Sequence, residues 1–188
     1  MSVKIIKTVE KGSFLDDTIN GIYSVHRLTE AQKGLIYEIS SGVIRWKRYL
    51  DWLLSLYVKK NVKKDVRYLL WTGFYQILFM KKAYYHVVKE IVDYAKKEHG
   101  NQIASFVNAV LRRFVNENIR EPVKTQNCDL AKNISVSYSF PDWLVKRWIN
   151  RFGQIRTEKL LKILNKSPQF AIRVNLAKIT RDDASDRL

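Results

Sequence analysis

Cysteine, histidine and glycine are all scarce in this chain of 188 residues, and their scarcity excludes several kinds of site. The single cysteine, Cys128, leaves no internal disulfide and no zinc site built from several cysteines. The three histidines, His26, His86 and His99, lack the spacing of paired metal ligands. The seven glycines lie too far apart for a loop that cradles a phosphate group. We therefore expect no catalytic, cofactor-binding or metal site in this chain.

Long apolar runs are also missing. The longest stretches, such as residues 68–71, are far too short to span a bilayer. The N-terminus has neither the apolar core nor the small-residue cleavage site of a secretory signal. Together with the lone cysteine, these features predict a protein of the reducing cytoplasm that has no membrane partner.

Acidic residues are far outnumbered by basic ones. The chain holds 34 Lys and Arg residues against 18 Asp and Glu residues, for a formal net charge of +16. A surplus of this size attracts polyanions and releases counterions when it meets phosphate groups. Nucleic acid is therefore the leading partner. An anionic membrane is a weaker candidate, because the basic residues do not gather on one amphipathic anchor, and a merely soluble basic protein is the third alternative.

Proline is absent from residues 1–121, and apolar residues recur there at helical spacing, which predicts an all-α bundle over residues 1–118. Helices are expected over about residues 16–26, from 29, from about 49, and over 62–80, 84–99 and 103–115. The hydroxyl of Thr29 can cap the second of these. Gly73, in the middle of the fourth, is a poor helix former whose small size allows a close helix crossing.

The last helix of the bundle has the cleanest pattern. Its apolar residues follow the i, i+3, i+4, i+7 spacing throughout: Ile103, Phe106, Val107, Val110, Leu111, Phe114 and Val115. With Phe106, Val110 and Phe114 inward, Asn108 and Arg112 point outward, and Arg113 flanks them. An amide and a guanidinium fork on one face suit RNA binding. The alternative is that one of the two arginines caps a neighbouring helix or pairs with an acid.

A second candidate RNA contact is the segment of residues 45–49, in which Arg45, Lys47 and Arg48 alternate with two aromatic residues. Cations that bind phosphates beside rings that stack on bases are typical of RNA-binding surfaces. The alternative is that the two rings belong to the core and the cations are merely solvated. Arg45 would join the polar face of the last helix if the second and last helices pack side by side.

The remainder of the chain predicts a linker and an incomplete second domain. Residues 119–138 lack periodicity and are predicted to be the linker. Two helices are expected after Pro141 and after Gly153, and the alternating residues 170–175 predict a strand. Residues 139–188 are therefore predicted to begin an α+β domain that the sequence does not complete.

Three motifs of the bundle resemble NusB-like domains in order and spacing. They are residues 42–45 (Gly-Val-Ile-Arg), 75–78 (Tyr-Gln-Ile-Leu) and 106–113 (Phe-Val-Asn-Ala-Val-Leu-Arg-Arg), of which the last is the most specific. Residues 139–144 (Ser-Phe-Pro-Asp-Trp-Leu) and 173–175 (Arg-Val-Asn) are similar to the next segment of Sun/Fmu-type 16S rRNA cytosine-C5 methyltransferases. The resemblance covers roughly residues 15–188.

This resemblance implies a NusB-like orthogonal helical bundle followed by a short α+β fragment of an RRM-like domain. It implies the RNA-binding N-terminal region of an rRNA methyltransferase, with 16S rRNA and the enzyme's own methyltransferase domain as partners. S-adenosylmethionine and the two catalytic cysteines of that family are expected in a domain outside this sequence, and Cys128 matches neither cysteine. An RNA-facing role is implied for Arg45, Asn108, Arg112 and Arg113.

Two other functions fit the sequence. A transcription antitermination factor of the NusB type would bind RNA together with a ribosomal protein, but it has no need of residues 139–188. A helical protein–protein adaptor would carry its charge incidentally, and the salt dependence of RNA binding separates it from the other two.

Overall fold

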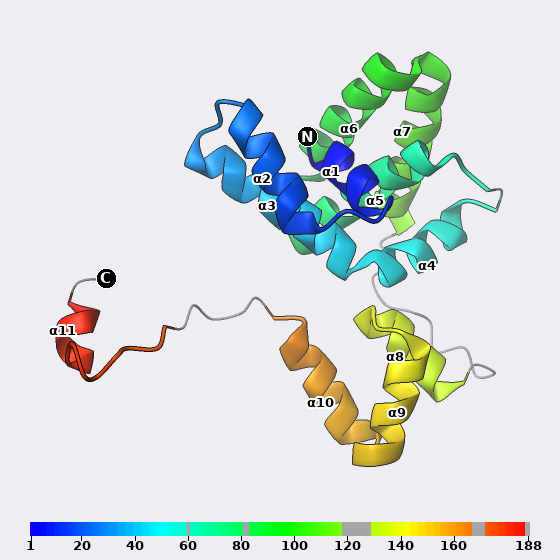
Figure 1. Cartoon of the computed structure of the whole chain (residues 1–188). Helices are drawn as coiled ribbons and strands as arrows, with labels where there is room; N and C mark the ends of the chain where they lie inside the picture. The colour runs from blue at the N-terminus through cyan, green and yellow to red at the C-terminus, as the bar shows by residue number, and fades with distance from the viewer. Residues whose placement is uncertain (60, 81–82, 118–128, 167–171, 187–188) are drawn as a thin grey trace.

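The computed structural model describes residues 1–59, 61–80, 83–117, 129–166 and 172–186 (Figure 1). All regular secondary structure in these ranges is helical, in agreement with the predicted all-α bundle. The first helices are α1 (Ser2–Val9), α2 (Leu15–Val25), α3 (Glu30–Arg45), α4 (Lys47–Tyr57), α5 (Lys64–Phe79), α6 (Tyr84–His99) and α7 (Asn101–Glu117). The others are α8 (Leu130–Tyr138), α9 (Asp142–Phe152), α10 (Gln154–Leu164) and α11 (Arg181–Ser185). No helix in the described ranges has the length and apolar character needed to cross a membrane.

Helix α5 lies at the centre of the bundle that α1 to α7 form. It packs against α1, α3, α4, α6 and α7, and residue 66 and residues 68–76 are all buried as a result. The ring centroids of Phe74 on α5 and Phe114 on α7 are 4.7 Å apart. Because α5 contacts both α6 and α7, it fixes the position of the two helices that carry the candidate site.

Gly73 confirms the predicted close helix crossing. A Cβ atom at this position would lie 2.7 Å from Cδ2 of Leu111, which is fully buried on α7. Two carbon atoms do not approach that closely without displacement. The hydrogen side chain of Gly73 therefore allows α5 and α7 to pack at their observed separation.

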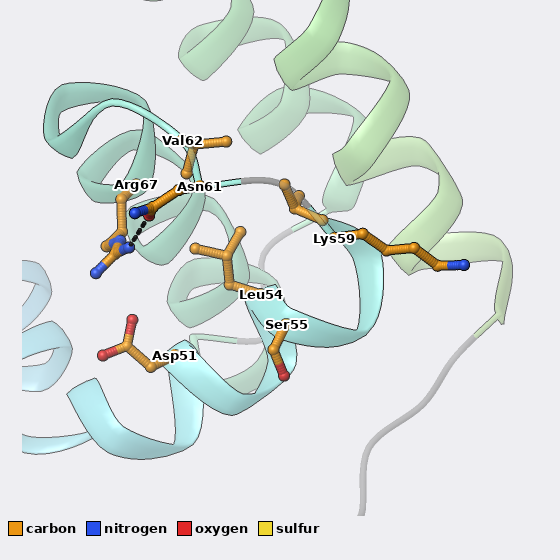
Figure 2. A pocket seen from close by; sticks show the side chains of 8 residues that line it. Asp51, Leu54, Ser55, Lys59, Asn61, Val62 and Arg67 are labelled. Carbon is orange, nitrogen blue, oxygen red and sulfur yellow. Dashed lines mark hydrogen bonds between the residues drawn. The ribbon is translucent and has the colours of Figure 1, made fainter.

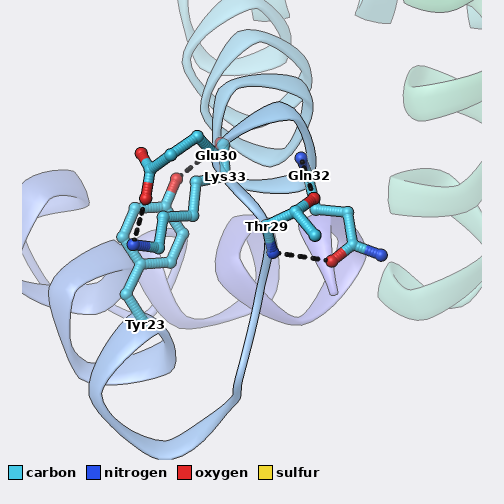
Figure 3. Close-up of polar contacts among 5 residues, drawn as sticks. All are labelled: Tyr23, Thr29, Glu30, Gln32 and Lys33. Atoms are coloured by element: carbon cyan, nitrogen blue, oxygen red, sulfur yellow. Dashed lines mark hydrogen bonds and ion pairs between the residues drawn. The ribbon is translucent and has the colours of Figure 1, made fainter.

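The N-terminus of α3 has the predicted cap (Figure 3). The hydroxyl of Thr29 accepts a hydrogen bond from the Gln32 N–H, and the Gln32 side chain accepts one from the Thr29 N–H, at 3.3 and 3.0 Å. This capping box satisfies backbone donors that the first turn of a helix leaves unpaired. The Tyr23 hydroxyl donates to the Lys33 carbonyl at 2.6 Å and thereby joins α2 to α3.

Two features of the bundle differ from the prediction. Helix α1 is not predicted, because its eight residues are too few to show a clear period, yet Ile5 and Ile6 are fully buried. Phe106 is predicted to point inward, but it is 36% exposed. Position 106 lies at the edge of the apolar stripe of α7, whereas Val107 and Val110 lie within the stripe and are buried.

The last nine residues of the predicted linker form helix α8. Asp129 caps it by accepting a hydrogen bond from the Ala131 N–H at 3.0 Å. The serines of this segment interrupt the apolar periodicity, but they form hydrogen bonds to the preceding turn of the helix. The Ser135 hydroxyl, for example, donates to the Ala131 carbonyl at 2.6 Å. Helix α8 packs against α9, α10 and α4, with Ala131, Ile134, Val145 and Leu161 buried between the helices. The first ten residues of the predicted linker lie outside the described residues.

The helices predicted after Pro141 and Gly153 are present as α9 and α10. The strand predicted over residues 170–175 is not seen in its described part, residues 172–175, which have no regular structure. A strand needs a neighbouring strand to pair its backbone groups, and the described residues contain none. The α+β character predicted for residues 139–188 is therefore not observed in the described ranges.

Candidate nucleic-acid interface

Asn108 and Arg112 lie together on α7 as predicted. The Arg112 Nε donates a hydrogen bond to Oδ1 of Asn108 at 3.1 Å, one helical turn away. Asn108 is half-buried and Arg112 is exposed. Among the described residues, no carboxylate lies within ion-pair distance of Arg112. The bond to Asn108 orients the guanidinium group while its charge stays available to an anion.

These two side chains line a groove between α6 and α7. The groove has a volume of about 670 Å³, and its α7 wall consists of Asn108, Arg112 and Asn116. Its α6 wall consists of Tyr84, Tyr85, Val88, Lys89, Val92 and Asp93. The α6 residues are not among the predicted site residues, because only the tertiary structure brings them beside α7. The two adjacent tyrosines at the start of α6 are the feature of the sequence that could have indicated this wall of the groove.

Arg113 faces away from this groove, toward α4. Its Nε lies 2.7 Å from Oε1 of Glu117, and its guanidinium carbon lies 5.5 Å from the centre of the Tyr57 ring. The hydrogen bond to Glu117 raises the pKa of the Arg113 guanidinium. Arg113 therefore matches the structural alternative, in which an arginine pairs with an acid, better than Arg112 does.

Arg45 is not brought beside the polar face of α7. It lies exposed at the C-terminus of α3, and α3 packs on α1, α2, α4 and α5 but not on α7. The condition for Arg45 to join this face, that the second and last predicted helices pack side by side, is therefore not met. The central helix α5 lies against both and separates them. Arg45 has no ion pair with another described residue.

Lys47 and Arg48 both have acidic partners. The Lys47 Nζ lies 2.7 Å from both carboxylate oxygens of Glu10, and 5.6 Å from the centre of the Trp71 ring. The Arg48 guanidinium pairs with Asp142 of α9. The Arg48 backbone N–H donates to the Ser139 hydroxyl at 3.1 Å. Arg48 thus joins α4 to the helices that follow the bundle.

The two aromatic residues of the 45–49 segment belong to the core. Tyr49 is 4% exposed, and the half-buried ring of Trp46 stacks on Phe79 of α5 with a centroid distance of 4.6 Å. These rings are not available to stack on bases. The structure favours the alternative in which the aromatic residues are structural. Two of the three cations, Lys47 and Arg48, are paired with acidic residues.

A smaller cavity of about 310 Å³ lies between α4 and α5 (Figure 2). Asp51 lines it opposite Arg67, whose Nη2 donates a hydrogen bond to Oδ1 of Asn61 at 3.2 Å. Burial raises the pKa of the Asp51 carboxyl above its usual range, and the positive charge of Arg67 opposes the rise. This cavity combines one acid with two cations, Arg67 and Lys59. We assign it no ligand.

Metal-binding chemistry has no candidate site in the described ranges. No group of three or more His, Cys, Asp or Glu side chains lies close enough to hold a metal ion there. Cys128 lies outside the described residues.

Comparison with known proteins identifies the family of this basic helical bundle. Residues 1–116 match the NusB family, and the chain belongs to that family. Residues 140–188 match the ferredoxin-like domain of RsmF/B-like methyltransferases. The two matches follow one another along the chain in the order that the sequence motifs predict.

Curated relatives match nearly the whole chain. It is 29% identical over 187 residues to the probable ribosomal RNA small subunit methyltransferase B of Bacillus subtilis (strain 168), covering 98% of this chain and 41% of that protein. Identity is 27% over 182 residues to the probable enzyme of that name from Synechocystis sp., with coverage of 95% and 40%. The chain is 26% identical over 182 residues to ribosomal RNA small subunit methyltransferase B of Salmonella paratyphi B, covering 94% of this chain and 40% of that protein. This chain thus spans about 40% of the length of these relatives.

Proposed function

We propose that this chain is the RNA-binding N-terminal region of an S-adenosylmethionine-dependent rRNA (cytosine-C5) methyltransferase, and that it serves recognition of 16S rRNA. The observation that carries the proposal is the pair of matches, NusB at residues 1–116 and the ferredoxin-like domain at 140–188. The relatives matched along 94–98% of the chain are named ribosomal RNA small subunit methyltransferases. Because of that similarity, we also propose that the chain binds RNA and lies in the cytoplasm.

The charge and the polar face of α7 support RNA binding. A net charge of +16 favours contact with a phosphate backbone. Of the six proposed RNA contacts, Asn108, Arg112 and Arg45 have no acidic partner among the described residues. Lys47, Arg48 and Arg113 would have to exchange a carboxylate for a phosphate, so we propose that they contribute less to affinity.

We propose the domain division 1–118, 119–138 and 139–188, with an RRM-like α+β fold for the last part once its sheet is complete. Exposed apolar side chains on α9 and α10 support a docking surface for the rest of the longer protein. Trp143 is 64% exposed, Ile155 73% and Ile163 63%. Burying such side chains is favourable, and the relatives extend well beyond this chain.

The described residues do not fit S-adenosylmethionine. A Rossmann-type site needs a strand followed by a glycine loop, and the described ranges contain no strand. We therefore propose that the cofactor binds elsewhere in the longer protein, and we derive no methyl-transfer step from these residues. A NusB-type antitermination factor remains the alternative function, but the match at residues 140–188 favours the methyltransferase.

Fluorescence anisotropy with a labelled fragment of 16S rRNA tests the proposal. We expect binding whose association constant falls steeply as the salt concentration rises, because each phosphate contact releases a counterion. We also expect tighter binding to 16S rRNA fragments than to an unrelated RNA of equal length. Absence of binding, or binding that is independent of salt, would contradict an RNA-binding role and favour the helical adaptor.

A further inference from the structure

We propose that the outer face of α9 is a second RNA contact, separate from the bundle that α1 to α7 form. This face, the α9 stripe, consists of Trp143, Arg147 and Arg151. Its arginines bind phosphate groups of an RNA strand, and its tryptophan stacks on a neighbouring base. The inference rests on the proposed function and adds to it a binding surface that lies beyond the NusB match at residues 1–116.

The geometry of α9 is the first support. The three residues of the stripe follow one another at intervals of four, so they lie along one face of the helix. Val145 and Ile149 point the other way and pack against the cluster between α8, α9 and α10. Among the described helices, α9 packs on α8 and α10 only (Figure 1). The stripe is therefore left open: Trp143 is 64% exposed, and both arginines are exposed.

The distribution of charge is the second support. Residues 129–166 hold eight Lys and Arg residues against three acidic residues. Each of the three acids already has a polar partner: Asp129 with Lys146, Asp142 with Arg48, and Glu158 with Gln154. Neither Arg147 nor Arg151 forms an ion pair with another described residue. The two guanidinium charges of the stripe are therefore available to an anion from outside the chain.

The chemistry of the stripe suits a nucleic-acid backbone. A guanidinium group binds two oxygens of one phosphate through its fork of N–H donors, and two such groups one helical turn apart bind successive sites along a strand. The exposed indole ring offers a face on which any base can stack. The stripe holds no amide or carboxylate that would read base edges. We therefore expect it to add affinity without adding sequence preference.

A protein surface is the competing occupant, because Trp143 is also one of the exposed apolar side chains that the rest of the longer protein can cover. The neighbours of the indole ring favour RNA. A protein that covered the stripe would remove two arginines from water and would have to supply a carboxylate for each. An RNA strand brings phosphates by its nature. Ile155 and Ile163 on α10 stay available for docking of the longer protein.

Fluorescence anisotropy with a labelled 16S rRNA fragment and an unrelated RNA of equal length tests the stripe. Arg147→Ala and Arg151→Ala should each lower the salt slope by about one counterion, and the double variant by about two. Trp143→Ala should weaken binding about tenfold without changing the slope. Both probes should lose affinity equally, because the stripe reads no sequence.

Three controls accompany these variants. Replacing both arginines by lysine keeps the charge and should keep the salt slope. Trp143→Phe keeps an aromatic ring and should retain most of the affinity. Lys132→Ala removes an exposed cation of α8 outside the stripe and should change binding little. Melting temperatures equal to that of the unmodified chain show that a lost affinity is not a lost fold.

The outcomes separate this inference from the proposed function. If the unmodified chain binds RNA with a steep salt dependence and all α9 variants bind equally well, the stripe is not an RNA contact and the proposed function stands. Losses for Lys132→Ala as large as for the single arginine variants would show diffuse attraction and would also overturn the stripe. If the unmodified chain binds neither RNA, the proposed function itself fails.

Discussion

Gly42 of α3 lies directly against the ring of Tyr75 of α5. A Cβ atom at position 42 would stand 2.0 Å from Cζ and 2.1 Å from Oη of that ring. The Tyr75 hydroxyl donates a hydrogen bond to Oε1 of Glu38 at 2.8 Å, and its ring stacks on Phe79 with a centroid distance of 5.2 Å. Two motifs that the sequence presents separately, residues 42–45 and 75–78, are thus the two sides of one helix contact.

Replacing Gly42 by alanine should destabilise the chain by about 1–3 kcal/mol, as overpacking of a core does. Displacing the Tyr75 ring would disturb its hydrogen bond to Glu38 and its stacking on Phe79. Urea denaturation measures the effect. Gly34→Ala is the matched control on the same helix, because a Cβ at position 34 meets nothing within 4 Å. It should stabilise the chain by up to about 1 kcal/mol through helix propensity. Equal effects of the two substitutions would contradict the Gly42–Tyr75 contact.

Replacing Arg112 by alanine should weaken binding to rRNA fragments and lower the salt slope by about one counterion. Arg113→Ala should have a smaller effect on RNA affinity, because Glu117 already neutralises that side chain. Arg27→Ala is the control, since Arg27 is exposed on the loop between α2 and α3, and neither of these helices packs on α7. The melting temperature should barely change for Arg112→Ala. A large loss of thermal stability with unchanged RNA affinity would remove Arg112 from the RNA site.

The pair of Arg48 and Asp142 should hold α9 against the bundle. Arg48→Ala and Asp142→Ala should each increase amide hydrogen exchange in α8 and α9, while exchange in α6 and α7 stays the same. The double variant should exchange no faster than the single variants, because both remove the same contact. Arg147→Ala, which changes an exposed arginine of α9, is the control. Additive effects of the two substitutions would show that the ion pair does not carry the contact.

Asp51→Asn should stabilise the chain at neutral pH and have little effect near pH 3. Burial raises the pKa of Asp51 in the folded chain above its unfolded value of 3.8. Below that value the carboxyl is neutral in both states and costs nothing. As the pH rises through the folded pKa, the charged form is penalised in the folded state and stability is lost. Asparagine removes that loss.

Melting temperatures measured from acid to neutral pH show whether the stabilisation by Asp51→Asn grows with pH. Asp17→Asn is the comparison, because Asp17 is exposed in the first turn of α2, where a negative charge is favourable. It should not stabilise the chain at neutral pH. A gain for Asp51→Asn that is the same at all pH values would contradict the raised pKa.

Helices α2 to α7, the cap at Thr29 and the outward direction of Asn108 and Arg112 could be predicted from the sequence. These features depend on spacing within one helix or on neighbours a few residues away, which a linear pattern records. Helix α8 was not predicted, because its serines interrupt the apolar pattern. Their hydroxyls form hydrogen bonds within the helix, which the pattern of apolar residues does not reveal. The NusB-like motifs were sufficient to predict the family.

Which cations are neutralised and which surfaces are assembled depends on contacts between helices that are far apart in the sequence. Lys47 meets Glu10 across 37 residues, and Arg48 meets Asp142 of a different helical group, so no local pattern distinguishes them from Arg45 or Arg112. The groove likewise needs α6 and α7 side by side. Such pairings depend on how the helices pack against one another, and burial of apolar faces is the main term that favours this packing.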